Sequence, residues 1–257
     1  MTTGSEGEAV AWKADEYDKL EKPHEAWARQ VLGRLELQGD ETILDAGCGS
    51  GALTKLLVDL VPDGRVIGAD SSSSMLAQAR ETLGDDVELI ESDLTELRLD
   101  TEVDVVFSNA VFHWVQDHNA LFARMFEALK PGGRIEAQCG GEGNIAELER
   151  VLESLGGDER FASYLRTERR AWNYASVGDT LLRLERAGFE DDKAWLEPWP
   201  VNPENPQMFL KTVILQWHLD RLPESLHDEF VDAVLGSVPR PLTVDYVRLN
   251  ISAGKPV

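Results

Sequence analysis

Apolar residues between positions 41 and 140 follow two alternating patterns. Short buried runs predict five strands, at residues 42–45, 65–70, 87–90, 103–108 and 134–139. Between these runs, apolar residues recur at the spacing of an amphipathic helix, as Leu53, Leu56, Leu57 and Leu60 do. Strands that alternate with helices in this way predict a parallel sheet with right-handed crossover connections.

The segments outside this core have a mostly helical pattern. Residues 1–40 predict an N-terminal helical cap, and two later helical blocks, 141–178 and 203–238, predict further cap insertions. Two more strands, near 193–199 and 244–251, are expected to complete the sheet. We therefore predict an open, mostly parallel, doubly wound α/β sheet, with residues 41–140 as its ligand-binding core and residues 141–257 supplying the remaining strands and caps.

The charge of the chain limits its partners. The 257 residues include 47 acidic and 25 basic side chains, which give a net charge of −22. Such a surface repels nucleic acids and anionic lipids, so we expect neither as a partner. An ordinary acidic enzyme would also carry excess acid, but an excess this large is typical of proteins that work in concentrated salt. We predict a halophilic source.

Nothing in the sequence indicates export, membrane insertion or a metal site. No apolar run reaches the roughly 18 residues of a membrane span, and the first residues lack the pattern of a signal peptide. The two cysteines and five histidines show no metal-binding spacing. We expect a cytoplasmic protein without a metal.

A glycine-rich loop follows the first strand of the core. Residues 45–51 read Asp-Ala-Gly-Cys-Gly-Ser-Gly, and glycines there allow a sharp turn and a close approach to a ligand. Gly47–Ala52 also fits the dinucleotide pattern G-x-G-x-x-G/A, and a plain tight turn would look similar. However, Asp45 lies two residues before the first glycine, where it would repel a pyrophosphate and attract a ligand with an ammonium group.

Acidic residues stand at or just beyond the ends of three successive strands. They are Asp45, Asp70 and Asp93. Asp70 is placed to hold ribose hydroxyls, and Asp93 to accept a hydrogen bond from an adenine amino group, with Leu94 and Met75 against the ring. Asp93 could instead cap a helix, and Met75 could simply fill the core. Because the carboxyl ends of parallel strands share one edge, the set predicts a nucleoside site.

Four segments resemble successive motifs of class I S-adenosylmethionine-dependent methyltransferases. They are ILDAGCGSG at 43–51, VIGADS at 66–71, SDL at 92–94 and KPGGR at 130–134. The resemblance covers about residues 40–140 and implies a Rossmann-like methyltransferase fold with S-adenosylmethionine as its cofactor. It assigns cofactor binding to Asp45, Gly47, Cys48, Gly49, Gly51, Asp70, Ser71, Met75, Asp93 and Leu94.

The segment SNAVFHWV at 108–115 narrows the resemblance to the trans-aconitate methyltransferase-like group. It implies that Asn109 and Trp114 line the methionine end of the cofactor. His113 is the candidate catalytic base or orienting group, or else only caps its loop. Methyl transfer from sulfur needs alignment more than it needs a nucleophile or a metal, so none is required here.

The acceptor is expected to be a small molecule, with a carboxylate favoured. Candidate acceptor-binding residues are Trp12 and Tyr17, which the resemblance places over the cofactor, together with Arg169, Arg170 and Tyr174. The arginines between 160 and 170 could clamp a carboxylate or simply face solvent. A hydroxyl or quinol acceptor would make His113 indispensable. An NAD-linked oxidoreductase and a non-catalytic adenosylmethionine-binding protein remain alternatives on the same fold. The oligomeric state is not predicted.

Overall fold

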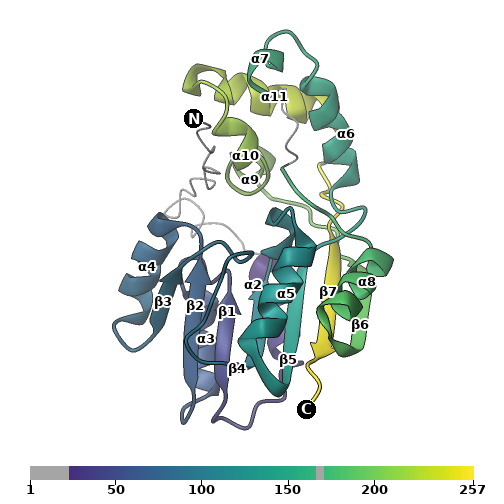
Figure 1. The fold of residues 1–257 in the computed structure, drawn as a ribbon. Coiled ribbons are helices and arrows are strands. Elements are labelled where there is room, and N and C mark those ends of the chain that lie inside the picture. The colour runs from purple at the N-terminus through teal and green to yellow at the C-terminus, as the bar shows by residue number, and fades with distance from the viewer. Residues whose placement is uncertain (1–22, 166–170) are drawn as a thin grey trace, which may run out of the picture.

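The computed structural model describes residues 23–165 and 171–257, and one β-sheet forms its centre (Figure 1). Within these residues the strands are β1 (Thr42–Ala46), β2 (Arg65–Asp70), β3 (Glu88–Glu91), β4 (Val103–Asn109), β5 (Leu129–Gly140), β6 (Glu190–Pro198) and β7 (Val247–Gly254). Their order is β3-β2-β1-β4-β5-β7-β6. The first five strands run parallel, and β7 runs antiparallel to both of its neighbours.

The predicted doubly wound, mostly parallel sheet is confirmed. Every predicted strand is present, although the last one lies three residues further along the chain than expected. Val244 instead pairs with Val201 in an isolated bridge, and Ser252 and Gly254 continue β7 by pairing with Glu136 and Arg134. The end of β7 is defined by backbone pairing with β5 and not by apolar side chains, so the hydrophobic pattern of the sequence could not locate it.

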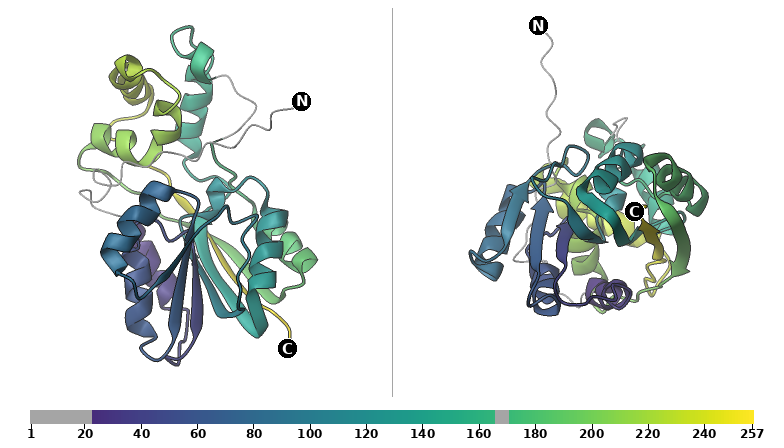
Figure 2. Two further views of the ribbon diagram at one scale, coloured as in Figure 1. Left: turned by 60° about the vertical axis from the view of Figure 1, so that its left-hand side comes forward. Right: turned by 60° about the horizontal axis from the view of Figure 1, so that its bottom comes forward.

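Helices cover both faces of the sheet because successive strand residues point to opposite sides. Ile43, Val66 and Val105 pack against α2 (Pro23–Leu32) and α3 (Ala52–Leu60), and α4 (Ser73–Leu83) packs beside α3. The next residue in each strand faces α5 (His118–Ala128) and α8 (Val177–Ala187). The two further views show these helix layers on either side of the strands (Figure 2).

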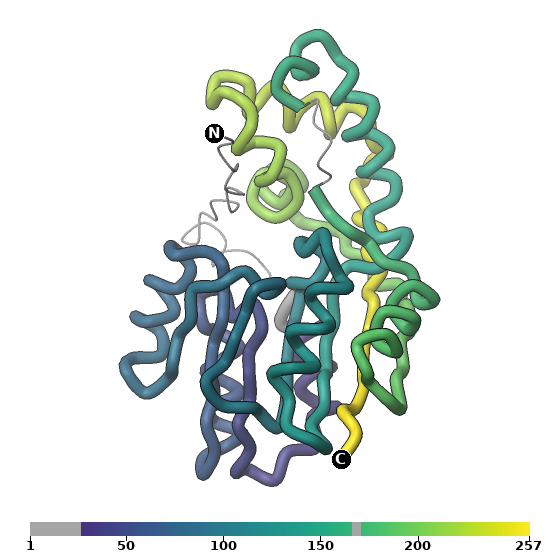
Figure 3. The backbone as a smooth tube through the Cα atoms, viewed as in Figure 1, coloured from purple at the N-terminus to yellow at the C-terminus, as the bar shows by residue number. Residues whose placement is uncertain are grey.

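A second group of helices lies beyond the carboxyl ends of the parallel strands (Figures 1 and 3). It contains α6 (Ala146–Leu155), α7 (Ala162–Leu165), α9 (Pro206–Phe209), the π-helical turn η2 (Leu210–Ile214), α10 (Gln216–Leu219), the turn η3 (Glu224–Leu226) and α11 (His227–Ser237). These helices share their own apolar core, which includes Phe161, Leu210 and Phe230. We refer to this group as the cap. Among the described helices, none is long and apolar enough to cross a membrane.

Polar side chains link β5 and β7 on the side of the sheet that α2 covers. Arg34 donates from Nε to Glu136 Oε2 and from Nη1 to Asn250 Oδ1, both at 2.9 Å. Gln138 donates to Asn250 Oδ1 at 3.1 Å, and its own Oε1 accepts from Arg248 Nε at 3.2 Å. Since Gln138, Arg248 and Asn250 are buried, this network fixes their side chains in single orientations.

Candidate functional site

The glycine loop after β1 leaves open space at only one of its three glycines. All three have positive φ angles, 88° at Gly47, 54° at Gly49 and 83° at Gly51. A Cβ at Gly47 would lie 2.3 Å from the Val111 side chain, and one at Gly51 would lie 2.8 Å from Leu83. At Gly49, no atom of the described residues lies within 4 Å of a Cβ position. Packing therefore requires the outer two glycines, whereas Gly49 borders room for a ligand.

Asp70, at the end of β2, is tied to this loop. Its Oδ2 accepts from the Gly49 backbone N–H at 3.0 Å, and its Oδ1 accepts from the Ser72 N–H at 2.8 Å. Burial raises the pKa of Asp70, and these two hydrogen bonds oppose that rise. Ser71 beside it is exposed, and Ser72 caps α4 through its side chain. The end of β2 and the glycine loop thus hold the Asp70 carboxylate beside the open space at Gly49.

Asp45 is almost completely buried, with 2% of its surface exposed. Thr54, in the first turn of α3, donates its hydroxyl to Asp45 Oδ2 at 2.7 Å. Burial raises the pKa of Asp45 to about 7, the Thr54 hydrogen bond opposes this, and the nearby charge of Asp70 adds to it. Cys48 lies between the two acids and is buried, which raises the pKa of its thiol. The loop therefore combines two carboxylates in a partly dry setting that favours a cationic ligand.

The residues expected around an adenine ring lie in α4 and in the segment just after β3. Met75 and Leu94 are buried, with 8% and 5% exposure. Asp93 is exposed, and its Oδ1 accepts from the backbone N–H and the hydroxyl of Thr95, at 2.8 and 2.7 Å. One oxygen of Asp93 therefore serves a local turn at residues 94–96, and no helix begins there, so Asp93 is not the helix cap of the alternative prediction.

The end of β4 carries a buried acceptor. Asn109 is 8% exposed, and its Oδ1 has no hydrogen-bond partner among the described residues. Buried amide oxygens are normally satisfied, so this atom is suited to accept a hydrogen bond from a ligand. The chain then turns through Ala110, whose φ is 62°, into the short helix η1 (Phe112–Trp114).

His113 lies in η1 with one ring nitrogen committed. Its Nδ1 accepts from the Gly140 backbone N–H at 3.2 Å, and its carbonyl accepts from Asn173 N. An acceptor nitrogen carries no proton, so this geometry assigns the neutral tautomer with hydrogen on Nε2. Taking up a second proton on Nδ1 would bring it against the Gly140 N–H. The ring is thus suited to donate a hydrogen bond and unsuited to act as a base.

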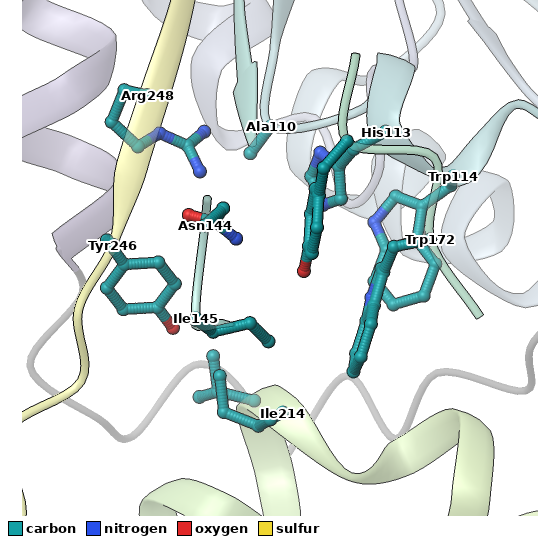
Figure 4. Close-up of a pocket in the computed structure, with 11 residues that line it drawn as sticks. Ala110, His113, Trp114, Asn144, Ile145, Trp172, Ile214, Tyr246 and Arg248 are labelled. Atoms are coloured by element: carbon teal, nitrogen blue, oxygen red, sulfur yellow. The ribbon is translucent and has the colours of Figure 1, made fainter. Parts of the chain in front are cut away.

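A cavity lies between η1, the start of α6, β7 and the cap (Figure 4). Arg248 points its guanidinium toward it from β7, near Asn144. Trp172 and Tyr174, which also line the cavity, stack with ring centres 5.7 Å apart. The described residues that line the cavity are Ala110, His113, Trp114, Asn144, Ile145, Trp172, Tyr174, Val213, Ile214, Tyr246 and Arg248.

The structure brings together at this cavity the catalytic candidate His113, the predicted cofactor residue Trp114 and the predicted acceptor residue Tyr174. Trp12, Tyr17, Arg169 and Arg170 lie outside the described residues. Arg160, the described member of the arginine cluster, pairs with Asp158 and Glu229 at 2.8 Å each on the surface, as the solvent-facing alternative expects.

Sequence reasoning missed Arg248, Asn144 and Tyr246. They come from segments that are about 100 residues apart, and no local motif joins them. The sequence offered little signal for Arg248, because in β7 it stands between Val247 and Leu249 in an alternating pattern, which normally places the polar residues toward solvent.

Comparison with known proteins identifies the family of this chain. A family model described as a methyltransferase domain matches residues 43–133. A trans-aconitate 2-methyltransferase of Azoarcus sp. (strain BH72) is 39% identical over 127 residues, which cover 49% of this chain and 50% of that protein. Another, from Methylobacterium nodulans, is 31% identical over 186 residues and covers 72% of this chain and 67% of that protein. The chain spans about half the length of several of the trans-aconitate 2-methyltransferases that it matches.

The fold is shared with solved structures as well. A mycolic acid cyclopropane synthase complexed with SAH and CTAB superimposes with a TM-score of 0.62 at 16% identity, covering 95% of this chain and 94% of that one. The sheet order and the acidic glycine loop define an S-adenosylmethionine-dependent methyltransferase. The chain belongs to the class I family of these enzymes and is homologous to the trans-aconitate 2-methyltransferases. The dinucleotide interpretation of the loop is set aside.

The residues at the glycine loop fit S-adenosylmethionine. The cofactor carries an ammonium group, a sulfonium charge and ribose hydroxyls, which two carboxylates can hold. The open space at Gly49 and the unsatisfied Oδ1 of Asn109 border the same edge of the sheet, since β1 and β4 are neighbours. The glycine loop and the end of β4 are therefore the parts of the site that would hold this cofactor.

Proposed function

We propose that the enzyme methylates a small organic carboxylate on oxygen. The observation that carries this proposal is the cavity beside η1, which contains a buried guanidinium but no carboxylate among its described lining residues. Its histidine is arranged as a hydrogen-bond donor. A carboxylate acceptor needs charge complementarity and alignment but no base, unlike an alcohol or a phenol. The homology to trans-aconitate 2-methyltransferases also supports an acid as acceptor.

Each side chain at the loop has a proposed task. Asp70 holds the ribose hydroxyls, and Asp45 pairs with the ammonium group. Met75 and Leu94 pack against the adenine, while Asn109 and Trp114 border the methionine end. Bound adenosylmethionine supplies a methyl group on a positively charged sulfur, which keeps the electrons of the broken bond. The protein's part is to exclude water and to align the acceptor oxygen with that methyl group.

Labelled methyl transfer tests the proposal. The purified enzyme, given methyl-labelled adenosylmethionine, is offered small carboxylic acids, phenols, quinols and amines in parallel. We expect the label in carboxylic acids, with trans-aconitate as the first compound to try. Label found only in phenols, quinols or amines would overturn the carboxylate assignment and leave the methyltransferase class intact.

Replacing His113 with asparagine should lower kcat by less than about tenfold, because no proton leaves a carboxylate acceptor. Asparagine can still accept the Gly140 N–H, so the loop keeps its shape. Steady-state kinetics with the best acid acceptor measures the effect, and His227→Asn, in the cap, is the matched control. If kcat fell by about 10² or more, His113 would be acting as a base, and a hydroxyl or quinol acceptor would be favoured.

Affinity for S-adenosylhomocysteine should rise with pH through about 7 and level off above it. Asp45 carries a proton below its pKa in the free protein and must lose it to pair with the ammonium group. Affinity should therefore fall by up to about tenfold per pH unit below 7. Calorimetry between pH 5.5 and 8.5 measures this dependence.

The variant Asp45→Asn isolates the effect of Asp45 from that of Asp70, whose pKa burial also raises. It keeps an acceptor for Thr54 but has nothing to titrate. We expect weaker binding and a much flatter pH profile. Identical slopes in the variant and the wild type would show that another group takes up the proton.

A further inference from the structure

Arg248 is one of the most deeply buried large side chains described, with 2% of its surface exposed. Its guanidinium lies over the Trp27 ring, 4.0 Å from the ring centre, and Trp27 meets Tyr246 edge-on at 5.0 Å. Gln138 accepts from its Nε at 3.2 Å. Stacking and this hydrogen bond fix the plane of the guanidinium, which is how arginine is prepared to bind a planar anion.

The guanidinium of Arg248 points toward the cavity. Figure 4 shows the guanidinium reaching from β7 toward the space beside Asn144. Asn144 is itself fixed, because its Oδ1 accepts from the Val247 N–H at 2.9 Å. None of the described lining residues is acidic, although the chain as a whole carries a charge of −22. Arg248 thus gives the described lining of the cavity a positive charge, which favours an anionic ligand.

Arg248 and the end of β4 belong to different strands of the sheet. Asn109 pairs with Gln138 of β5, and Arg248 pairs with Gly140 of β5 from the other side. Ala110, which follows Asn109, and Arg248 therefore line the cavity from opposite sides of β5. An acceptor in the cavity can present one polar group to the methyl donor near the end of β4 and another to Arg248.

The polar group of the acceptor that Arg248 holds cannot be the group that receives the methyl. A carboxylate held by a guanidinium shares its lone pairs and its charge with that partner, which makes it a poor nucleophile. The carboxylate that receives the methyl group must keep a lone pair directed at the methyl carbon. One carboxylate cannot serve both purposes well.

We infer that Arg248 is the specificity-determining residue of the acceptor site and binds a second, non-reacting carboxylate of a di- or tricarboxylate. Gln138 acts as its positioning residue. This inference rests on the proposed function and makes it more specific. It assigns an anion clamp to a residue from the last strand of the sheet, whereas Arg169 and Arg170 lie outside the described residues.

Binding without turnover tests the inference. The enzyme is loaded with S-adenosylhomocysteine, and calorimetry compares trans-aconitate with crotonate, an unsaturated acid with a single carboxylate. The wild type should bind trans-aconitate at least about tenfold more tightly. In Arg248→Met, the affinity for trans-aconitate should fall by about 10- to 100-fold, whereas the affinities for crotonate and S-adenosylhomocysteine stay unchanged.

Two further variants keep the result interpretable. Arg221 stacks on Trp217 at 3.7 Å in the cap but does not line the cavity, so Arg221→Met controls for loss of a stacked arginine. Arg248→Lys retains the charge without the planar fork and should bind trans-aconitate with intermediate affinity. If Arg248→Met fails to fold, two measurements still test the inference. They are the affinity of Arg248→Lys for trans-aconitate and the affinities of the wild type for trans-aconitate and crotonate.

Two results would overturn the inference. One is equal affinity of the wild type for trans-aconitate and crotonate, and the other is unchanged trans-aconitate binding in folded Arg248→Met or Arg248→Lys. Failure of the proposed function looks different. In that case the Arg248-dependent preference for trans-aconitate persists in calorimetry, but no carboxylic acid receives labelled methyl.

Discussion

Asp70→Ala is expected to bind S-adenosylmethionine about 10- to 150-fold more weakly than the wild type, a loss of about 1.5–3 kcal/mol. If Asp70 accepts both ribose hydroxyls in a half-buried position, its removal leaves two ligand donors without partners. It also frees the Gly49 and Ser72 N–H groups that the carboxylate now holds. Both effects should lower the affinity for the cofactor more than they lower the stability of the fold.

Calorimetry with the cofactor, together with a thermal unfolding curve for each variant, measures this effect. Asp70→Asn is the matched control, because it keeps an acceptor oxygen for one backbone N–H but has no second carboxylate oxygen. We expect it to fall between the alanine variant and the wild type. Unchanged affinity in a folded Asp70→Ala protein would show that the ribose does not lie at the end of β2.

Gly49→Val is expected to abolish measurable cofactor binding. The Gly49 φ of 54° disfavours any branched side chain, and the valine would fill the space in which no described atom lies within 4 Å. Backbone strain alone would lower stability by about 1–2 kcal/mol without blocking a ligand. The added volume at the ligand position blocks it.

Gly132→Val separates the two effects. Gly132 also has a positive φ, 80°, and its nearest contact for a Cβ is an ordinary 3.6 Å to Val257. It lies near the start of β5, at the amino-terminal ends of the parallel strands, whereas the glycine loop lies at their carboxyl ends. Both variants should lose similar stability, and only Gly49→Val should lose binding. Normal binding by Gly49→Val would show that the ligand does not approach this glycine.

The sequence was most informative where one short segment determines both fold and chemistry. The loop at 45–51 shows this, since its acid, its glycines and its strand-to-helix position are all local. The apolar pattern located the strands for the same reason. Consecutive residues such as Ile43 and Leu44 are both buried because each faces a different helix layer, so a parallel strand appears as a continuous apolar run.

The acceptor cavity could not be predicted in this way. Gln138 and Arg248 lie in buried strands, where their polarity counts against burial. The hydrogen bond between them, the bond from Gln138 to Asn250 and the stacking of Arg248 on Trp27 explain why both are tolerated. That pairing depends on β5 and β7 being neighbours. Such neighbours are set by the topology of the sheet, which brings together residues 110 positions apart.

His113 shows a different limit. Its residue type and place after β4 made it a candidate base, yet these features could not reveal which ring nitrogen was engaged. The backbone N–H of Gly140, from the neighbouring strand, decides that question in the structure. A histidine's protonation pattern follows from contacts that its own segment does not contain.

Identifying the atom to which the methyl group is transferred tests the central claim most directly. Methyl-labelled adenosylmethionine is incubated with the enzyme and trans-aconitate, and the product is then exposed to mild alkali. Transfer to a carboxylate oxygen forms a methyl ester, so alkali should release the label as methanol and regenerate the acid. A labelled product that survives alkali would be methylated on carbon, nitrogen or an ether oxygen, and would contradict the account.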